Sequence, residues 1–331
     1  MIIDAVKIWN FRSHEAYSLK CRKKTSLIVG ENGTGKTSIL EAIYLALRGK
    51  SFRAGDGEIL QRGAEFYRVE LLYTSGEKVV VTYDGMKRSF LVGDKKWARL
   101  PKKNKYPVVL FLPSDLHLVE SSPARRRDYF DRVLAELDDN YGSSLSKYNK
   151  ALKQRNELLK KETVTENELF SWNVMLAKYG LLVRKARKKF ISDCNARLTT
   201  VYRTIAETDD EAVIEYRLQG DEVSESEYLA RLTEETRRDV ILGHTGFGVH
   251  RDGYEFIFNG SVAEGSASRG EVRSVMLALK FIEAELILAR TGRWPVVLLD
   301  DVFSELDEVR QKCLVKNFKE NQVLITSVDE V

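Results

Sequence analysis

Eight consecutive residues near the amino terminus have the types and spacing that hold the phosphates of a nucleotide. Residues 30–37 read Gly-Glu-Asn-Gly-Thr-Gly-Lys-Thr, which matches the pattern G-x-x-x-x-G-K-[ST], and a mainly apolar run at 26–29 precedes them. Glycines let backbone N–H groups turn inward and cradle phosphate at the start of a helix. Lys36 is expected to reach the β- and γ-phosphates, and the Thr37 hydroxyl to ligate Mg²⁺. A Gly-rich turn with a chance lysine is the alternative, but the strand–loop–helix context favours a nucleoside triphosphate site.

The residues predicted to bind the nucleotide in this loop are Gly30, Glu31, Asn32, Gly33, Thr34, Gly35, Lys36, Thr37 and Ser38.

Two adjacent carboxylates supply the second part of this chemistry. Asp300 and Asp301 follow an apolar run at 295–299, which predicts a buried strand with both acids at its carboxyl end, where ligands bind in open α/β sheets. Asp300 is placed to complete the Mg²⁺ shell, and Asp301 to orient the attacking water or accept its proton. Lys36 and Asp301 are therefore the predicted catalytic residues, and Thr37 and Asp300 the predicted metal ligands. Buried strands often end in Asp, so this pattern gains weight only beside the phosphate loop.

A third pattern lies just upstream of the acidic strand. Ser-Arg-Gly-Glu at 268–271 opens an amphipathic helix, and Ser-Glu-Leu-Asp follows the acids at 304–307. This order resembles the signature motif, Walker B strand and D-loop of ABC-type ATPases. The resemblance implies that Ser268 and Gly270 contact the γ-phosphate held by a partner subunit and that Asp307 lies at the nucleotide site. Free N–H groups at such a helix start suit phosphate, although alone the pattern indicates an ordinary N-capped core helix.

Within that superfamily the chain resembles the RecF family of bacterial DNA replication and repair proteins over essentially its whole length. The motifs that carry the resemblance, in the family's order, lie at 6–13, 40–44, 49–53, 109–116, 122–127 and 249–252. Arg269 and Glu271 depart from the family's usual Ser-Gln-Gly-Gln, and Val249 stands where the family has proline. Arg269 either faces solvent or adds a positive group near the partner's γ-phosphate.

The resemblance implies an ATP- and Mg²⁺-dependent DNA-binding ATPase in recombinational repair, replication and the SOS response. It also implies a head-to-head homodimer that clamps duplex DNA near single-strand gaps through backbone phosphates, cooperates with a RecR-type mediator, and opens on hydrolysis. The alternative is another short SMC-like or overcoming-lysogeny-type ATPase that acts as a scaffold. A small-molecule kinase is more distant, because it needs neither the signature helix nor the D-loop.

We expect an α/β fold: an ABC-type ATPase head, with a P-loop α/β core and an antiparallel β part, and an inserted lobe built on a helical hairpin. The N-terminal part of the head is placed at 1–122, the mainly helical insert at 123–239 and the C-terminal part of the head at 240–331. Lys36 and Asp300 are expected on adjacent parallel strands.

Alternating apolar residues at 68–73 and 78–83 predict a β-hairpin in the head. Apolar residues three or four apart from Tyr141 to Leu159 and from Trp172 to Phe190 predict the helical hairpin. A strand over 212–218 is expected to return from the lobe to the head.

A basic run on the second helix of this hairpin is a candidate surface for DNA phosphates. Its members are Arg184, Lys185, Arg187, Lys188 and Lys189. A solvated helix face explains such a run equally well. Three arginines at 125–127 begin another helix, where the dipole disfavours cations, and they indicate either an anionic partner or salt bridges inside the lobe.

Composition agrees with a large soluble protein of two lobes. The 331 residues are 43% hydrophobic, enough for a sizeable core, and the net charge of +4 is modest, so DNA affinity must come from local patches. Cys21, Cys194 and Cys313 lack metal-ligand spacing and favour reduced thiols. The first strand is too polar for a signal peptide or membrane span, which predicts a cytoplasmic protein without a membrane partner.

Overall fold

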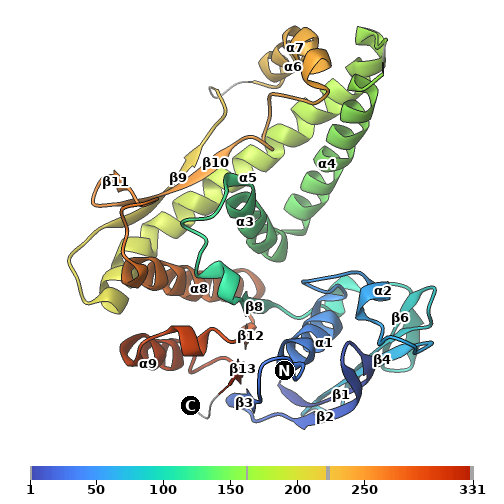
Figure 1. Cartoon of the computed structure of the whole chain (residues 1–331), viewed down its shortest axis with the longest axis vertical. Helices are drawn as coiled ribbons and strands as arrows, with labels where there is room; N and C mark the ends of the chain where they lie inside the picture. Colours follow the sequence, from blue (N-terminus) through green and yellow to red (C-terminus); the bar gives the residue numbers. More distant parts are fainter. Residues whose placement is uncertain (1, 162, 221–223, 329–331) are drawn as a thin grey trace. The chain divides into compact units, whose positions relative to one another are not determined.

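A computed structural model describes residues 2–161, 163–220 and 224–328 (Figure 1). The chain divides into two compact units. The first takes in the residues up to 116 and from 280 onward, and the second comprises residues 117–279. The second unit therefore extends beyond the insert expected at 123–239, mainly because 40 further residues, 240–279, belong to it.

A four-stranded parallel sheet forms the centre of the first unit. Its strand order is β3 (Thr25–Val29), β13 (Val323–Ser327), β12 (Val296–Leu299) and β8 (Val108–Phe111). All residues of β8, β12 and β13 are buried, as in sheets covered on both faces. The expectation that the phosphate-loop strand and the acidic strand are adjacent is wrong. β13 lies between β3 and β12 and pairs with both, so the last apolar segment joins the two halves of the predicted site.

A six-stranded antiparallel sheet makes up the other half of the first unit. Its order is β2 (His14–Lys20), β1 (Ile3–Phe11), β4 (Tyr67–Tyr73), β5 (Lys78–Tyr83), β6 (Arg88–Val92) and β7 (Lys95–Trp97). The predicted β-hairpin is confirmed as the antiparallel pair β4 and β5. Helix α1 (Lys36–Arg48) contacts strands of both sheets and is buried along most of its length, so one apolar core serves both sheets.

Short elements complete the first unit: α2 (Asp56–Ile59), η1 (Lys102–Asn104), η2 (Pro113–Asp115), η3 (Phe303–Glu305) and α9 (Glu308–Asn317). A buried amide fastens the two sheets. The Gln322 side chain accepts from Ile3 N at 2.7 Å and donates to Ile3 O at 2.7 Å and to Arg22 O at 2.9 Å. Because Gln322 directly precedes β13, these bonds tie the first strand of the chain to the last one described.

The second unit is mainly helical. Its helices are α3 (Pro123–Leu137), α4 (Asp139–Leu159), α5 (Glu166–Ala206), α6 (Glu225–Glu234) and α7 (Thr236–Leu242). α4 and α5 run antiparallel against each other (Figure 1), which confirms the predicted helical hairpin. α5 starts with a capping box, in which Thr165 N donates to Glu168 Oε2 at 2.9 Å. Among the described residues no helix has the length and apolar character to span a membrane.

A small antiparallel sheet also belongs to the second unit. Its order is β11 (Ser261–Val262), β10 (Gly253–Phe258) and β9 (Ala212–Arg217). The strand predicted over 212–218 therefore exists, but it pairs with β10 inside this unit and does not return to the head. Its buried residues Ala212 and Ile214 pair with Phe258 and Phe256, and this ladder holds the segment after 240 in the second unit. Helix α8 (Arg269–Thr291) begins in the second unit and continues into the first at Lys280.

A fully buried arginine holds three helices of the second unit together. Arg155 on α4 donates to Asn173 Oδ1 on α5 at 2.7 Å, to Asp239 Oδ2 on α7 at 2.6 Å and to Thr245 Oγ1 at 2.8 Å. A charge taken out of water is tolerated only when it is paired and hydrogen-bonded in this way.

Candidate nucleotide-binding site

The phosphate loop connects β3 to α1 and is shaped by glycines. Gly33 and Gly35 have φ values of +84° and +92°, which L side chains rarely adopt. Gly35 is also crowded, since a Cβ there would lie 2.4 Å from His14 Nε2 and 2.5 Å from Ser13 Oγ. His14 Nε2 in turn lies 3.0 Å from Gly35 O. The start of β2 thus supports the loop where α1 begins, at a position that only glycine fits.

The charge at this helix start suits an anion. α1 has no side-chain cap and no acidic residue in its first turn, so its N–H groups and positive dipole end face the loop. The Lys36 side chain is only 5% exposed, and its Nζ donates to Gly30 O at 2.7 Å and Glu31 O at 3.1 Å. Nζ also lies 3.9 Å from Asp301 Oδ1, which places a cation between the loop and the acidic pair.

The two predicted metal ligands meet directly. Thr37 Oγ1 donates to Asp300 Oδ1 at 2.8 Å, and Thr326 Oγ1 on β13 approaches the same oxygen at 3.0 Å. Burial raises the pKa of Asp300, while the hydrogen bonds from Thr37 and Thr326 and the nearby positive charge of Arg53 act in the opposite direction. A hydroxyl and a carboxylate that converge in this way are the oxygen ligands that Mg²⁺ prefers.

Asp301 has an uncommon backbone conformation and a buried carboxylate oxygen. Its backbone adopts φ 49°, and its N–H donates to Thr326 Oγ1 at 2.8 Å, which holds this uncommon conformation in place. In the described part of the chain its buried Oδ1 has no hydrogen-bond partner. A buried acceptor without a donor is costly, so this oxygen is suited to receive a proton or a water molecule.

Three of the family-like motifs converge on one buried carboxylate of α1. Glu41 is fully buried and accepts from Arg12 Nε at 3.0 Å and Arg12 Nη2 at 2.9 Å, and this hydrogen bonding raises the pKa of Arg12. Ser51 Oγ donates to Glu41 Oε1 at 2.5 Å and accepts from the backbone N–H groups of Arg53 and Ala54. The cluster fixes the segment that carries Arg53, whose charge acts on Asp300.

The signature segment has the local geometry of a capped helix. Ser268 N donates to Glu271 Oε2 at 2.6 Å, and Ser268 Oγ accepts from Glu271 N at 3.2 Å, so Glu271 closes a capping box and Ser268 itself stays exposed. Asp307 caps α9, where its Oδ1 accepts from Arg310 N at 2.9 Å.

The basic run on α5 needs a correction. Arg184 is 4% exposed and pairs with Asp252 at 2.8 Å, and Arg187 is 1% exposed and pairs with Asp131 at 2.8 Å. Both guanidinium groups are buried and each is paired with a carboxylate inside the second unit, so neither is available to DNA. Lys185 and Lys189 are exposed and Lys188 is half-buried, because they lie on the outer face of the same helix.

The arginines at the start of α3 form bonds inside the second unit. Arg126 pairs with Glu264 at 3.0 Å, and Arg127 Nη1 donates to Asp252 O at 3.0 Å. Of the two explanations offered by the sequence, internal bonding applies to these two side chains.

Three residues at the site were not assigned from the sequence. Thr326, His14 and Arg53 each contact or act on a predicted site residue. Position alone offers a clue for Thr326, which lies at the carboxyl end of an apolar strand. Arg53 falls inside a motif that carried the resemblance and His14 directly follows another, but neither motif suggested a chemical role for them.

This arrangement of parallel sheet, phosphate loop, paired acids and helical lobe defines a P-loop ATPase of the ABC type. A family model described as AAA ATPase domain matches residues 1–171. The chain is 34% identical to the DNA replication and repair protein RecF of Ruminiclostridium cellulolyticum, over 100% of this chain and 93% of that protein. It is 36% identical to the RecF protein of Moorella thermoacetica, over 95% of this chain and 86% of that protein. The chain belongs to the RecF family, whose members act in DNA replication and repair, and it is an ATPase.

Solved structures agree with this placement. A structure described as the recombination mediator protein RecF-ATPrS in the RecFOR pathway superposes with a TM-score of 0.88 at 29% identity, covering 99% of this chain and 92% of that one. An SMC head bound to the winged-helix domain of ScpA shares the fold alone, with a TM-score of 0.53 at 16% identity, covering 100% of this chain and 90% of that one.

Proposed function

We propose that this chain binds ATP with Mg²⁺ at the phosphate loop and uses hydrolysis to control its hold on DNA. The convergence of Thr37 and Asp300, with Lys36 close by, carries the proposal. Thr37 and Asp300 would hold the metal, which neutralises phosphate charge when bound. Lys36 would neutralise the β- and γ-phosphates, and Asp301 would take the proton of the attacking water. A solved relative described as RecF-ATP, with a TM-score of 0.86, supports ATP as the nucleotide.

The switch is proposed to be a head-to-head homodimer. Ser268, Gly270 and Asp307 would complete the site of the partner copy, so that the γ-phosphate bridges two heads and its loss separates them. A ligand shifts such an equilibrium only through contacts it makes in one state, and the γ-phosphate is what distinguishes ATP from ADP.

The ligand of the closed dimer is proposed to be duplex DNA near single-strand gaps, with a RecR-type mediator as partner, in the cytoplasm. Lys185, Lys188 and Lys189 remain as the candidate phosphate contacts, and the binding should be salt-sensitive and weakly dependent on sequence.

Binding to gapped, duplex and single-stranded DNA with ATP or ADP tests this proposal. Lys36→Ala should abolish the ATP-dependent part, whereas Lys20→Ala, an exposed lysine on β2, should leave it intact. Light scattering on the same samples should show an ATP-dependent dimer that Ser268→Arg disrupts without loss of nucleotide binding. Equal DNA binding with ATP and ADP would instead favour an ATPase scaffold.

A further inference from the structure

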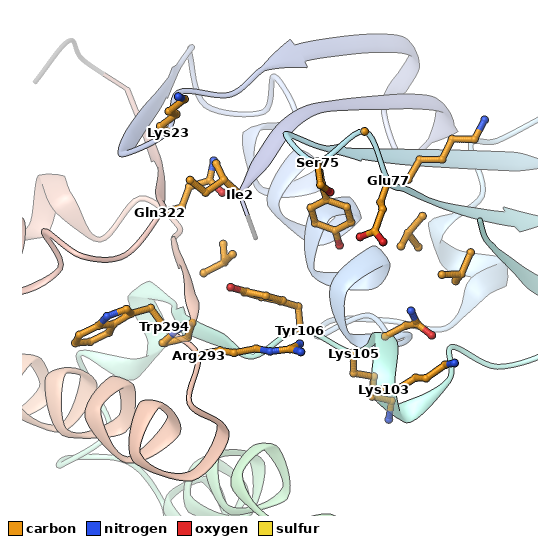
Figure 2. Close-up of a pocket in the computed structure, with 18 of the residues that line it drawn as sticks. Ile2, Lys23, Ser75, Glu77, Lys103, Lys105, Tyr106, Arg293, Trp294 and Gln322 are labelled. Carbon is orange, nitrogen blue, oxygen red and sulfur yellow. The ribbon is translucent and has the colours of Figure 1, made fainter.

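A cavity lies at the edge of the parallel sheet where its strands begin (Figure 2). Its volume is about 1160 Å³, and all of its lining residues belong to the first unit. Lys24, Tyr106, Pro295 and Gln322 line it and come just before β3, β8, β12 and β13 respectively. The nucleotide site follows the other ends of these strands, so a molecule in this cavity does not compete with ATP.

The cavity has an excess of positive charge. Six cationic side chains line it against the three carboxylates Glu77, Asp94 and Glu320; the cations are Lys23, Lys24, Lys78, Lys103, Lys105 and Arg293. Within residues 2–161, 163–220 and 224–328, no ion pair engages Lys23, Lys78, Lys103 or Arg293. Cations gathered around one hollow repel each other, so an anion is the ligand that this surface favours.

Hydroxyl donors add to these charges. Tyr73 and Tyr106 line the same cavity with nearly buried rings, and Arg293 lies beside Tyr106 (Figure 2). Burial raises the pKa of both phenols, so each keeps its proton and can donate it to an anionic oxygen. Trp294, 36% exposed, contributes an aromatic ring to the lining.

Size and residue type indicate which anion fits. Pockets for small molecules span roughly 300–1,000 Å³. The volume of this cavity, about 1160 Å³, lies above that range, so it has room for a short segment of a longer chain. Lysine is depleted at the cores of protein–protein interfaces but is a usual partner of backbone phosphates. Duplex DNA is a stiff rod that lies on a surface, whereas a single strand can bend into a hollow.

We propose that this basic cavity binds a short single-stranded segment of nucleic acid through its phosphates, in an ATP-independent manner. The site is separate from the proposed clamp and does not depend on it. A chain with both sites would hold a duplex and the single strand next to it at different surfaces.

Fluorescence anisotropy with a labelled oligothymidylate and the full chain, without nucleotide, tests the proposal. Lys23→Glu combined with Lys103→Glu should weaken binding about tenfold or more and flatten its salt dependence. Lys312→Glu combined with Lys316→Glu is the matched control, because it makes the same charge change on α9 of the same unit, and should stay within about threefold of the unchanged chain. Lys23→Arg with Lys103→Arg should retain binding, since the charge is kept.

The outcomes separate this site from the clamp. Retained oligothymidylate binding by Lys36→Ala supports an ATP-independent site, even if the clamp proposal fails. Equal weakening by the cavity variant and the α9 control would show only an effect of net charge and overturn the proposal. Loss of duplex binding to the same extent as single-strand binding would overturn the single-strand assignment. ATP binding by each variant confirms that it is folded.

Discussion

The hydroxyl of Thr37 lies 2.8 Å from the carboxylate of Asp300, although 263 positions separate them in the chain. The contact depends on a third element, β13. It lies between β3, which leads through the phosphate loop to Thr37 on α1, and β12, which Asp300 directly follows, and its Thr326 hydroxyl lies 3.0 Å from the same carboxylate oxygen. The metal-binding half of the site is therefore assembled from the first turn of α1 and from the carboxyl ends of two neighbouring strands, β12 and β13.

Replacement of Asp301 should separate catalysis from binding. Asp301→Asn removes the proton acceptor but keeps the backbone N–H that bonds to Thr326, so we expect ATP turnover to fall about 100-fold or more with ATP affinity nearly unchanged. Steady-state hydrolysis and equilibrium binding of a fluorescent ATP analogue measure the two effects. Turnover at the level of the unchanged chain would remove Asp301 from the catalytic role.

Because the pKa of Asp300 is raised, we expect the Mg²⁺-dependent ATP affinity to decline at a higher pH than it would at a site built on exposed aspartates. Protonation removes the charge that holds the metal. Acidification should have the opposite effect on folding stability. Because the folded chain binds this proton more tightly than the unfolded chain, the ionised Asp300 lowers the free energy of unfolding at neutral pH, and this loss becomes smaller as pH falls. ATP titrations across pH, with Mg²⁺ or with EDTA, isolate the effect. In Asp300→Asn the Mg²⁺-dependent part should be small and flat with pH; a persistent acid decline would point to another group.

The ion pair between Arg12 and the buried Glu41 should matter for stability as well as for the site. Arg12→Ala leaves a fully buried carboxylate without its cation, which should cost about 3 kcal/mol of unfolding free energy. Arg22→Ala, at an exposed arginine of the same unit, should change it by less than about 0.5 kcal/mol. Adding Glu41→Gln to Arg12→Ala should recover part of the loss, because a neutral amide is cheaper to bury. Urea unfolding measures these changes. Equal unfolding midpoints for Arg12→Ala and Arg22→Ala would show that the ion pair does not stabilise the fold.

His250 should make the second unit sensitive to acid. Its Nδ1 lies 2.7 Å from Tyr148 Oη and its Nε2 lies 3.0 Å from Thr245 O, a pattern that a neutral ring satisfies, and burial lowers its pKa from 6.5 to about 4. The unfolded chain then takes up this proton first, so stability is lost as pH falls from about 6.5 towards about 4, by up to about 3 kcal/mol.

Unfolding of His250→Gln at neutral and mildly acidic pH checks this. The variant should lose less stability on acidification than the unchanged chain, whereas His117→Gln, at an exposed histidine of the same unit, should follow the unchanged chain. Identical pH profiles for all three proteins would exclude His250 as the sensitive group.

Sequence patterns with a strict local geometry were predictive. The phosphate loop, the β4–β5 hairpin and the α4–α5 hairpin each follow from spacing within a short window, and the structure contains all three elements. The meeting of Thr37 with Asp300 was also foreseeable, since both follow the carboxyl ends of apolar strands.

Long-range pairing was not foreseeable from local patterns. No pattern within residues 323–327 predicts that they form a strand between β3 and β12, and no pattern within 212–217 predicts that they pair with β10. From the sequence, Arg184 and Arg187 are interpreted as part of a phosphate-binding run. The local pattern does not reveal that Asp252 and Asp131, distant in sequence, lie beside them and neutralise their charges.

The position of β13 has a consequence for how the protein is made. A ribosome adds roughly 5–20 residues per second, so the second unit, complete at residue 279, has time to fold while the first still lacks its central strand. Until residues 323–327 emerge, β3 and β12 have no partner between them, and Gln322 is not yet present to fasten Ile3. We therefore expect the nascent ATPase head to be most prone to misfolding late in synthesis, after the helical lobe has had time to fold.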